Sequence, residues 1–302
     1  LFLWKLSCFM LNLSMNHKLI FILSFVLLVA CQKEQQALLS QKNIKIIGAG
    51  TTFYSDEDYL RLVELTDTSK IYTIAEFKYS MNNIAQIVSK YKDRAGAFPT
   101  LYNVVTNVAY ETLNNMHTEY AEMGKAFMNE FGKHYIRNFH SYLLGQPIEK
   151  AWLNYYKRVA DKKNTILHLG MSGINAHITY DIPFVLDDIN AVDSFFDDFK
   201  VYTDFIASTY PQVAIELKNQ YGVQKADDAF KLFQLGDLID AVGGEGYTTH
   251  LVIDVLRSQS WQRGLDLQKG VKNTQQMNNI CFSDFQIREN ILQGAEDAKL
   301  LY

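Results

Sequence analysis

Apolar residues recur at three- and four-residue spacing along the chain after Asp67, and this period constrains the fold more than any other sequence feature. The spacing is that of one face of an α-helix, whereas a half-buried strand would alternate. Proline or glycine interrupts the pattern at several points, where helices can end. We predict an all-α fold. The apolar stripes are Leu101, Val104, Val105 and Val108; Phe127, Phe131, Tyr135 and Phe139; Phe195, Phe196, Phe199, Tyr202, Phe205 and Ile206; and Leu251, Ile253, Val255 and Leu265.

The composition supports a packed core and excludes other classes of protein. Of 302 residues, 48% are apolar and 13% aromatic, which excludes a disordered chain. The formal net charge of -4 supplies no basic face. Because nucleic-acid binding depends on neutralising phosphates with Lys and Arg, we expect no nucleic-acid partner.

Residues 15–31 resemble the signal peptide of a bacterial lipoprotein. Residues 15–18 (MNHK) form a short basic region, and residues 19–29 form an uninterrupted apolar run of the length that signal peptides use. The run ends at residues 28–31 (LVAC), which are similar to a lipobox. The resemblance implies cleavage before Cys31 and attachment of a lipid to its thiol.

This interpretation sets the domain boundaries and the location. Residues 1–14 are interpreted as upstream sequence, residues 15–30 as signal peptide, residues 31–54 as a tether and short extended arm, and residues 55–302 as a single all-α domain. The alternative is an uncleaved anchor helix, and both interpretations place the domain outside the cytoplasm. We expect an outer-membrane lipoprotein of the cell envelope, facing the periplasm or the surface, whose membrane partner is reached through the lipid on Cys31.

The remaining cysteines and the residues after Cys31 add two constraints. Gln32 stands where inner-membrane lipoproteins carry Asp, and residues 32–34 (QKE) resemble a tether that exports lipoproteins to the cell surface. Cys8 lies in the upstream segment, which leaves Cys281 as the only cysteine of the predicted helical domain. The sequence therefore predicts no intrachain disulfide and no zinc site built from several thiolates.

Two segments begin like ligand-binding loops and lack residues that the ligand requires. Residues 48–50 (GAG) are similar to the start of a dinucleotide loop, but Phe53 occupies the third glycine position and acidic residues follow. Residues 188–193 begin like a calcium loop, yet they lack its glycine, and Phe199 stands where the bidentate glutamate is needed. We interpret both as turns.

The polar residues of the segment 173–183 (GINAHITYDIP) are the candidate functional residues. His177 and Asp181 are four residues apart, so on a helix they share one face and can bond to each other or to a common ligand. Asn175 lies on another face, close to that of His168. Buried polar groups need partners, which leaves two interpretations: a structural pair in the core, or a metal or catalytic site. The sequence requires no cofactor, and a divalent metal fits the second interpretation, with further ligands from His134, His140, Asp237, Asp240 or His250.

The same segment resembles the signature G-M-N-A-H-I-N-x-D-L-P of the domain of unknown function numbered 5995. It departs from that signature at Ile174 and Thr179. Residues 98–109 (FPTLYNVVTNVA) are similar to the first helix of the family and residues 131–152 to its second and third. Arg257 and Trp261 match its C-terminal helix more loosely. The resemblance implies a helical domain and implies no activity. It covers residues 95–190 well.

A weaker resemblance supports an enzymatic alternative. The spacing H-x-x-x-D is also found in exported, helical, zinc-dependent phospholipase C and nuclease families. Val185 and Asp187 replace the later Pro and His of that signature. The first hypothesis is therefore a lipid-anchored envelope protein with a binding or structural role, whose protein or small-molecule partner the sequence does not identify. The second is an exported metal-dependent hydrolase that uses His177 and Asp181.

Overall fold

Helices follow one another along the described part of the chain, and because no strand occurs in it, the all-α prediction is confirmed. The computed structural model describes residues 54–117, 121–224, 226 and 247–301. These residues all belong to one unit of the chain, residues 46–302. The predicted signal peptide, Cys31 and the arm up to residue 53 lie outside them. No helix in the described ranges is long and apolar enough to cross a membrane.

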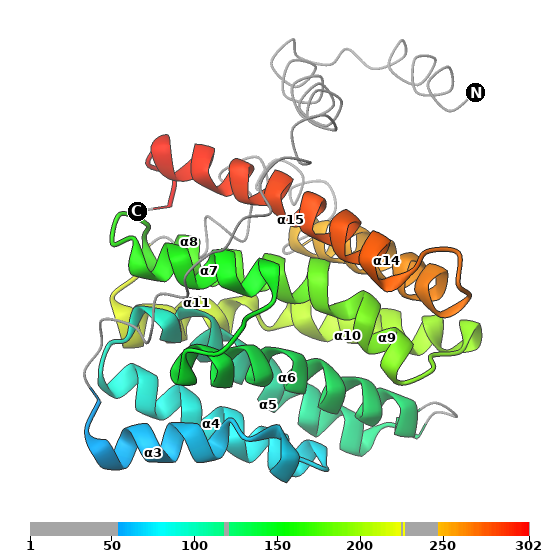
Figure 1. The fold of residues 1–302 in the computed structure, drawn as a ribbon, viewed down its shortest axis with the longest axis horizontal. Helices are drawn as coiled ribbons and strands as arrows, with labels where there is room; N and C mark the ends of the chain where they lie inside the picture. The colour runs from blue at the N-terminus through cyan, green and yellow to red at the C-terminus, as the bar shows by residue number, and fades with distance from the viewer. Residues whose placement is uncertain (1–53, 118–120, 225, 227–246, 302) are drawn as a thin grey trace. The chain divides into compact units, whose positions relative to one another are not determined.

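Figure 1 shows the order of the helices along the chain. They are α3 (Asp56–Leu65), α4 (Ile74–Lys90), α5 (Ala97–Asn115), α6 (Ala121–Leu144), α7 (Lys150–Ala160), α8 (Ile166–Ala176), a π-helical segment (His177–Asp181), α9 (Ile182–Asp188), α10 (Phe196–Ser208), α11 (Tyr210–Tyr221), α14 (Tyr247–Gln268) and α15 (Thr274–Asp297).

Capping residues fix the start of several helices. Thr73 accepts a hydrogen bond from the backbone N–H of Glu76, whose side chain accepts in return from the N–H of Thr73, which forms a capping box at α4. Asn273 and Gln276 form the same reciprocal pair at α15. These bonds satisfy backbone donors that the first helical turn leaves unpaired.

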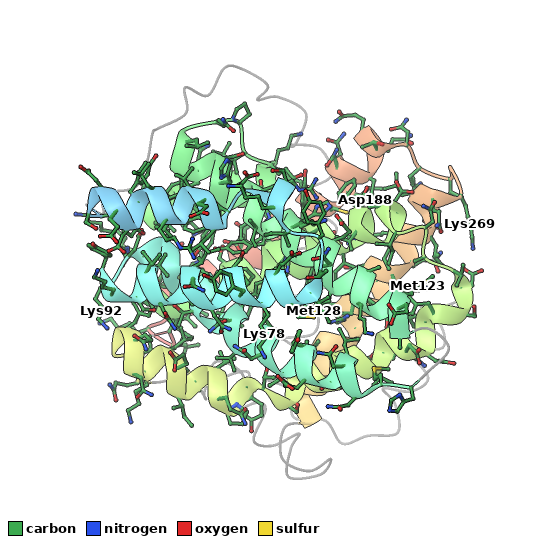
Figure 2. All side chains as sticks on the ribbon, turned by 90° about the horizontal axis from the view of Figure 1, so that it is seen from below. Lys78, Lys92, Met123, Met128, Asp188 and Lys269 are labelled. Carbon is green, nitrogen blue, oxygen red and sulfur yellow. The ribbon has the colours of Figure 1, made fainter. Side chains whose placement is uncertain are left out.

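The packing of α5, α8 and α14 builds the region around the polar motif. α5 packs against α4, α11 and α8, and α8 packs in turn against α15. α14 runs along α9, and α6 contacts both α4 and α9. α3 and α4 cover one side, where polar and charged side chains face outward (Figure 2). The π-helical segment therefore lies among α6, α8, α14 and α15.

Two glycines allow helices to approach closely in this region. A Cβ atom on Gly173 would lie 2.5 Å from the side chain of Phe98, which joins α8 to α5. A Cβ atom on Gly132 would lie 2.1 Å from the ring of Phe77, which joins α6 to α4. Real Cβ contacts are not this short, so these positions require glycine.

Two predicted apolar stripes differ from the faces that are buried. On α14, Val255 is 46% exposed, whereas Arg257, Ser260 and Trp261 are buried. On α5, the predicted valines are only half-buried, and the deeply buried residues are Phe98, Leu101, Tyr102, Thr106 and Leu113. Apolar residues occur on more than one face of each helix, so the neighbouring helices decide which face is covered.

The expectation that residues 173–183 form a regular helix is corrected by the π-helical segment between α8 and α9. Pro183 lies two residues after this segment, in the first turn of α9. Proline has no N–H, and its ring crowds the carbonyl four residues earlier, which here belongs to Thr179. The wider π turn accommodates both effects. Such turns are frequent at functional sites.

Candidate functional site

His177 and Asp181 form a hydrogen-bonded pair that spans the π-helical segment. The Nδ1 atom of His177 lies 2.7 Å from Oδ2 of Asp181. Trp152, from α7, donates its indole N–H toward both carboxylate oxygens, at 3.1 Å each. Asp181 has no exposed surface, and His177 is 3% exposed. The carboxylate is therefore held from two sides within the core.

Burial shifts both groups of the pair toward their neutral forms. It raises the pKa of Asp181 well above its usual range, and the nearby negative charge of Glu149 raises it further. Burial also lowers the pKa of His177 well below its usual range, with contributions from His134 and Arg257. A low-dielectric surrounding penalises the charged form of each group.

An aromatic cage, formed by Phe98, Tyr102, Phe131, Tyr135 and Trp152, surrounds the imidazole of His177. The Phe131 ring stacks on it with a centroid distance of 3.4 Å and an interplanar angle of 7°. Tyr102 and Phe98 contact it edge-on at 4.6 and 5.4 Å. The buried Nε2 atom of His177 has no hydrogen-bond partner among the described residues. The cage fixes the ring and separates it from water.

A second group of side chains, of types that can bind a metal ion, shares Asp181 with this pair. Ligand atoms of His134, Glu149 and Asp181 all lie within 4.8 Å of one another. His134, on α6, is buried, and Glu149, at the start of α7, is exposed. His134 Nε2 also lies 2.9 Å from Oδ2 of Asp188, which Figure 2 labels. The cluster therefore extends from the buried core to the surface.

Of the other candidate ligands named from the sequence, His140 lies elsewhere and the rest fall outside the described side chains. His140 Nδ1 contacts the hydroxyl of Thr66 at 2.8 Å. Asp237 and Asp240 lie outside the described residues, and His250 lies on α14 with its side chain outside them. Sequence reasoning missed Glu149, because nothing in the 31 residues between it and Asp181 indicates their proximity.

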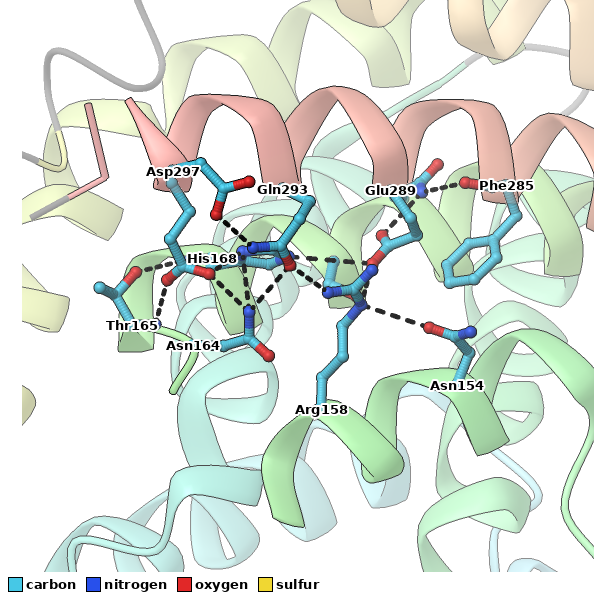
Figure 3. Close-up of polar contacts among 12 residues, drawn as sticks. Asn154, Arg158, Asn164, Thr165, His168, Phe285, Glu289, Gln293 and Asp297 are labelled. Carbon is cyan, nitrogen blue, oxygen red and sulfur yellow. Dashed lines mark hydrogen bonds and ion pairs between the residues drawn. The ribbon is translucent and has the colours of Figure 1, made fainter. Parts of the chain in front are cut away.

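Asn175 faces away from the His177–Asp181 pair, toward α15. Its amide donates to the carbonyl of Phe285 at 3.0 Å and to Oε1 of Glu289 at 2.9 Å. Ser172 donates to the same Glu289 carboxylate, and the Arg158 guanidinium pairs with it at 2.7 Å. Figure 3 shows this buried network between α7, α8 and α15. The polar motif therefore serves two separate helix contacts.

His168 contributes to the same network at the C-terminal end of α15. Its Nδ1 atom lies 2.7 Å from Oε2 of Glu296. Burial opposes ionisation of Glu296, but hydrogen bonds from Thr165, Asn164 and His168 outweigh it and lower the pKa of Glu296. The ionised carboxylate is thus the form that holds α15 to the start of α8.

Comparison with known proteins identifies the family. The model of a family of unknown function, DUF5995, matches residues 74–285, which include the whole His177–Asp181 region. The chain belongs to this family. No curated protein and no solved structure matches the chain. The family description assigns no activity.

Proposed function

We propose that this protein is a lipid-anchored protein of the cell envelope whose helical domain has a binding or structural role. In this proposal Asn175, His177 and Asp181 are polar groups of the core. The observation that carries it is the enclosure of the His177–Asp181 pair: Trp152 holds the carboxylate and Phe131 stacks on the imidazole. Buried polar groups with fixed partners specify how helices pack.

The geometry supports the alternative hydrolase, with His177 and Asp181 as ligands or acid–base partners, less well. A catalytic nitrogen or oxygen must come within hydrogen-bond reach of the substrate. Asp181 occupies Nδ1 of His177, and Nε2 is buried. A substrate would reach this imidazole only after side chains of the aromatic cage had moved.

Thermal unfolding of pair variants in the presence of a chelator tests the structural role. We expect His177→Ala to lower the free energy of unfolding by about 3–5 kcal/mol, because it removes a hydrogen bond to the buried Asp181 and leaves a cavity inside the aromatic cage. Asp181→Asn keeps the shape of the side chain and should lose less. The matched controls are His117→Ala and Asp197→Asn, both at exposed positions. If His177→Ala melts like its control, the structural interpretation is wrong.

The membrane anchor is tested at Cys31, which lies outside the described residues. The proposal predicts that the wild-type chain incorporates labelled palmitate and partitions into detergent. Cys31→Ala should lose the label and accumulate as an unprocessed or soluble form, whereas Cys8→Ala should behave like wild type. Equal labelling and partitioning of the wild-type and Cys31→Ala chains would exclude lipidation at this residue.

A further inference from the structure

We propose that His134, Glu149 and Asp181 form a binding site for a divalent transition-metal ion. The ligand atoms of the three side chains lie within 4.8 Å of one another, and they come from α6, the start of α7 and the π-helical segment. The inference goes beyond the proposed function, because it assigns a ligand to Asp181 together with two residues, His134 and Glu149, that the core pair does not need.

The donor set defines the class of ion. One imidazole nitrogen and two carboxylate oxygens suit ions such as Zn²⁺ and Mn²⁺, whereas Ca²⁺ and Mg²⁺ prefer oxygen ligands alone. Ligands about 2.1 Å from a shared Zn²⁺ are separated by about 3–4 Å in tetrahedral geometry. Because Glu149 is exposed, a small shift of its carboxylate can close the remaining gap. Water would complete the coordination on that side.

Asn138 already holds one of the proposed ligands, Glu149, beside the helix that carries His134. Asn138 accepts from the backbone N–H of Glu149 and donates to its Oε2 atom, each at 3.0 Å. The same Asn138 amide donates to the carbonyl of His134 at 2.8 Å. The exposed carboxylate is thus tied to the helix that carries His134, which distinguishes it from a freely rotating surface glutamate.

The contact between His134 and Asp188 is an arrangement that metal-ligating histidines commonly have. When Nε2–H of His134 donates to Oδ2 of Asp188, at 2.9 Å, the lone pair remains on Nδ1. A carboxylate in this position orients the imidazole and increases its basicity. The Asp181 carboxylate is oriented too, by its contacts with His177 and Trp152.

A cation at this site would also relieve an unfavourable interaction. The carboxyl groups of Glu149 and Asp181 have ligand atoms within 4.8 Å of each other, and Asp181 has no exposed surface. A divalent ion between them compensates both carboxylates. The exposed side of the cluster gives the ion a path to it.

Calorimetric titration of the full chain tests the proposal. The protein is purified in detergent without a histidine tag, treated with EDTA, dialysed, and titrated separately with Zn²⁺, Mn²⁺, Mg²⁺ and Ca²⁺. We expect one Zn²⁺ or Mn²⁺ to bind per chain and to raise the melting temperature. We expect Glu149→Gln to weaken binding at least tenfold, while Glu57→Gln, at an exposed position in the first turn of α3, leaves it unchanged.

The outcomes of the metal titration are distinct from those of the unfolding experiment on the His177–Asp181 pair. Glu149→Gln keeps the size of the side chain and its hydrogen bond from Asn138, so circular dichroism should show the wild-type fold. His134→Gln should lose binding as well. If the wild type does not bind a transition-metal ion, or if Glu149→Gln binds it as tightly as wild type, the proposal is overturned. Tighter binding of Mg²⁺ or Ca²⁺ would overturn the assigned class of ion.

Discussion

At the scale of single residues, Asp181 shows how one buried carboxyl group connects several side chains. Its oxygens contact His177 on the same π-helical segment and Trp152 on α7, and it lies within 4.8 Å of His134 and Glu149. Unsatisfied, such a group would cost the protein the desolvation energy of a carboxyl group. Its partners, and not its polarity alone, make its burial tolerable.

Trp152→Phe is expected to lower the free energy of unfolding by about 1–3 kcal/mol, since it removes the N–H that both oxygens of Asp181 accept. Tyr156→Phe is the matched control, because the buried Tyr156 hydroxyl has no hydrogen-bond partner among the described residues. Urea unfolding of both variants measures the difference. An equal loss in the two variants would show that the indole N–H contributes nothing specific.

At the scale of elements, the run from α8 to α9 combines a close helix contact with the π-helical segment. Gly173 lets α8 approach Phe98 on α5, and Phe98 in turn contacts the imidazole of His177. The widened turn then carries His177 and Asp181 into the aromatic cage. The position of the pair therefore depends on the packing of α5 against α8.

Gly173→Ala should destabilise the protein by about 1–3 kcal/mol, because its Cβ atom would overlap the side chain of Phe98. Gly294→Ala, on α15, should be neutral or stabilise by up to about 1 kcal/mol, since nothing lies within 4 Å of its Cβ position. Thermal melts of the two variants test the contrast. Two alanine variants of equal stability would contradict the close contact.

At the scale of the whole described helical unit, polar contacts join α15 to helices that lie more than a hundred residues earlier. Glu289 binds Ser172, Asn175 and Arg158, and Glu296 binds His168. Both carboxylates are buried, so removing one of their partners is costly. The network fixes where α15 docks along α8.

The lowered pKa of Glu296 predicts acid-sensitive docking of α15. Its contribution to stability is present above the ordinary pKa of 4.5 and is lost as the pH falls through the lower pKa of the folded protein. Glu296→Gln should lower the free energy of unfolding by about 2 kcal/mol at neutral pH. As the pH falls below 4.5, the free energy of unfolding of this variant should decrease less than that of wild type. Unfolding measured between neutral and acid pH checks this. Parallel pH profiles would exclude the assigned role.

The sequence by itself determined the helical class, a few of the helix ends and the polar motif. Each of these depends on residues close together along the chain. The spacing of three and four residues reflects neighbouring turns of one helix. α6 and α10 end close to Gly145 and Pro211, two of the glycine and proline residues that interrupt the apolar pattern. The spacing of His177 and Asp181 likewise puts the two side chains within reach of each other.

Only the tertiary structure decided which faces are buried and which residues meet. Arg257 faces inward on α14 because α9 and α10 cover that side, whereas the sequence pattern favoured Val255. Glu149 reaches Asp181 only because α7 starts beside the π-helical segment, and Asn175 binds Glu289 across 114 residues. Periodicity carries no information about such distant pairs, since the free energy of packing all the helices together selects them.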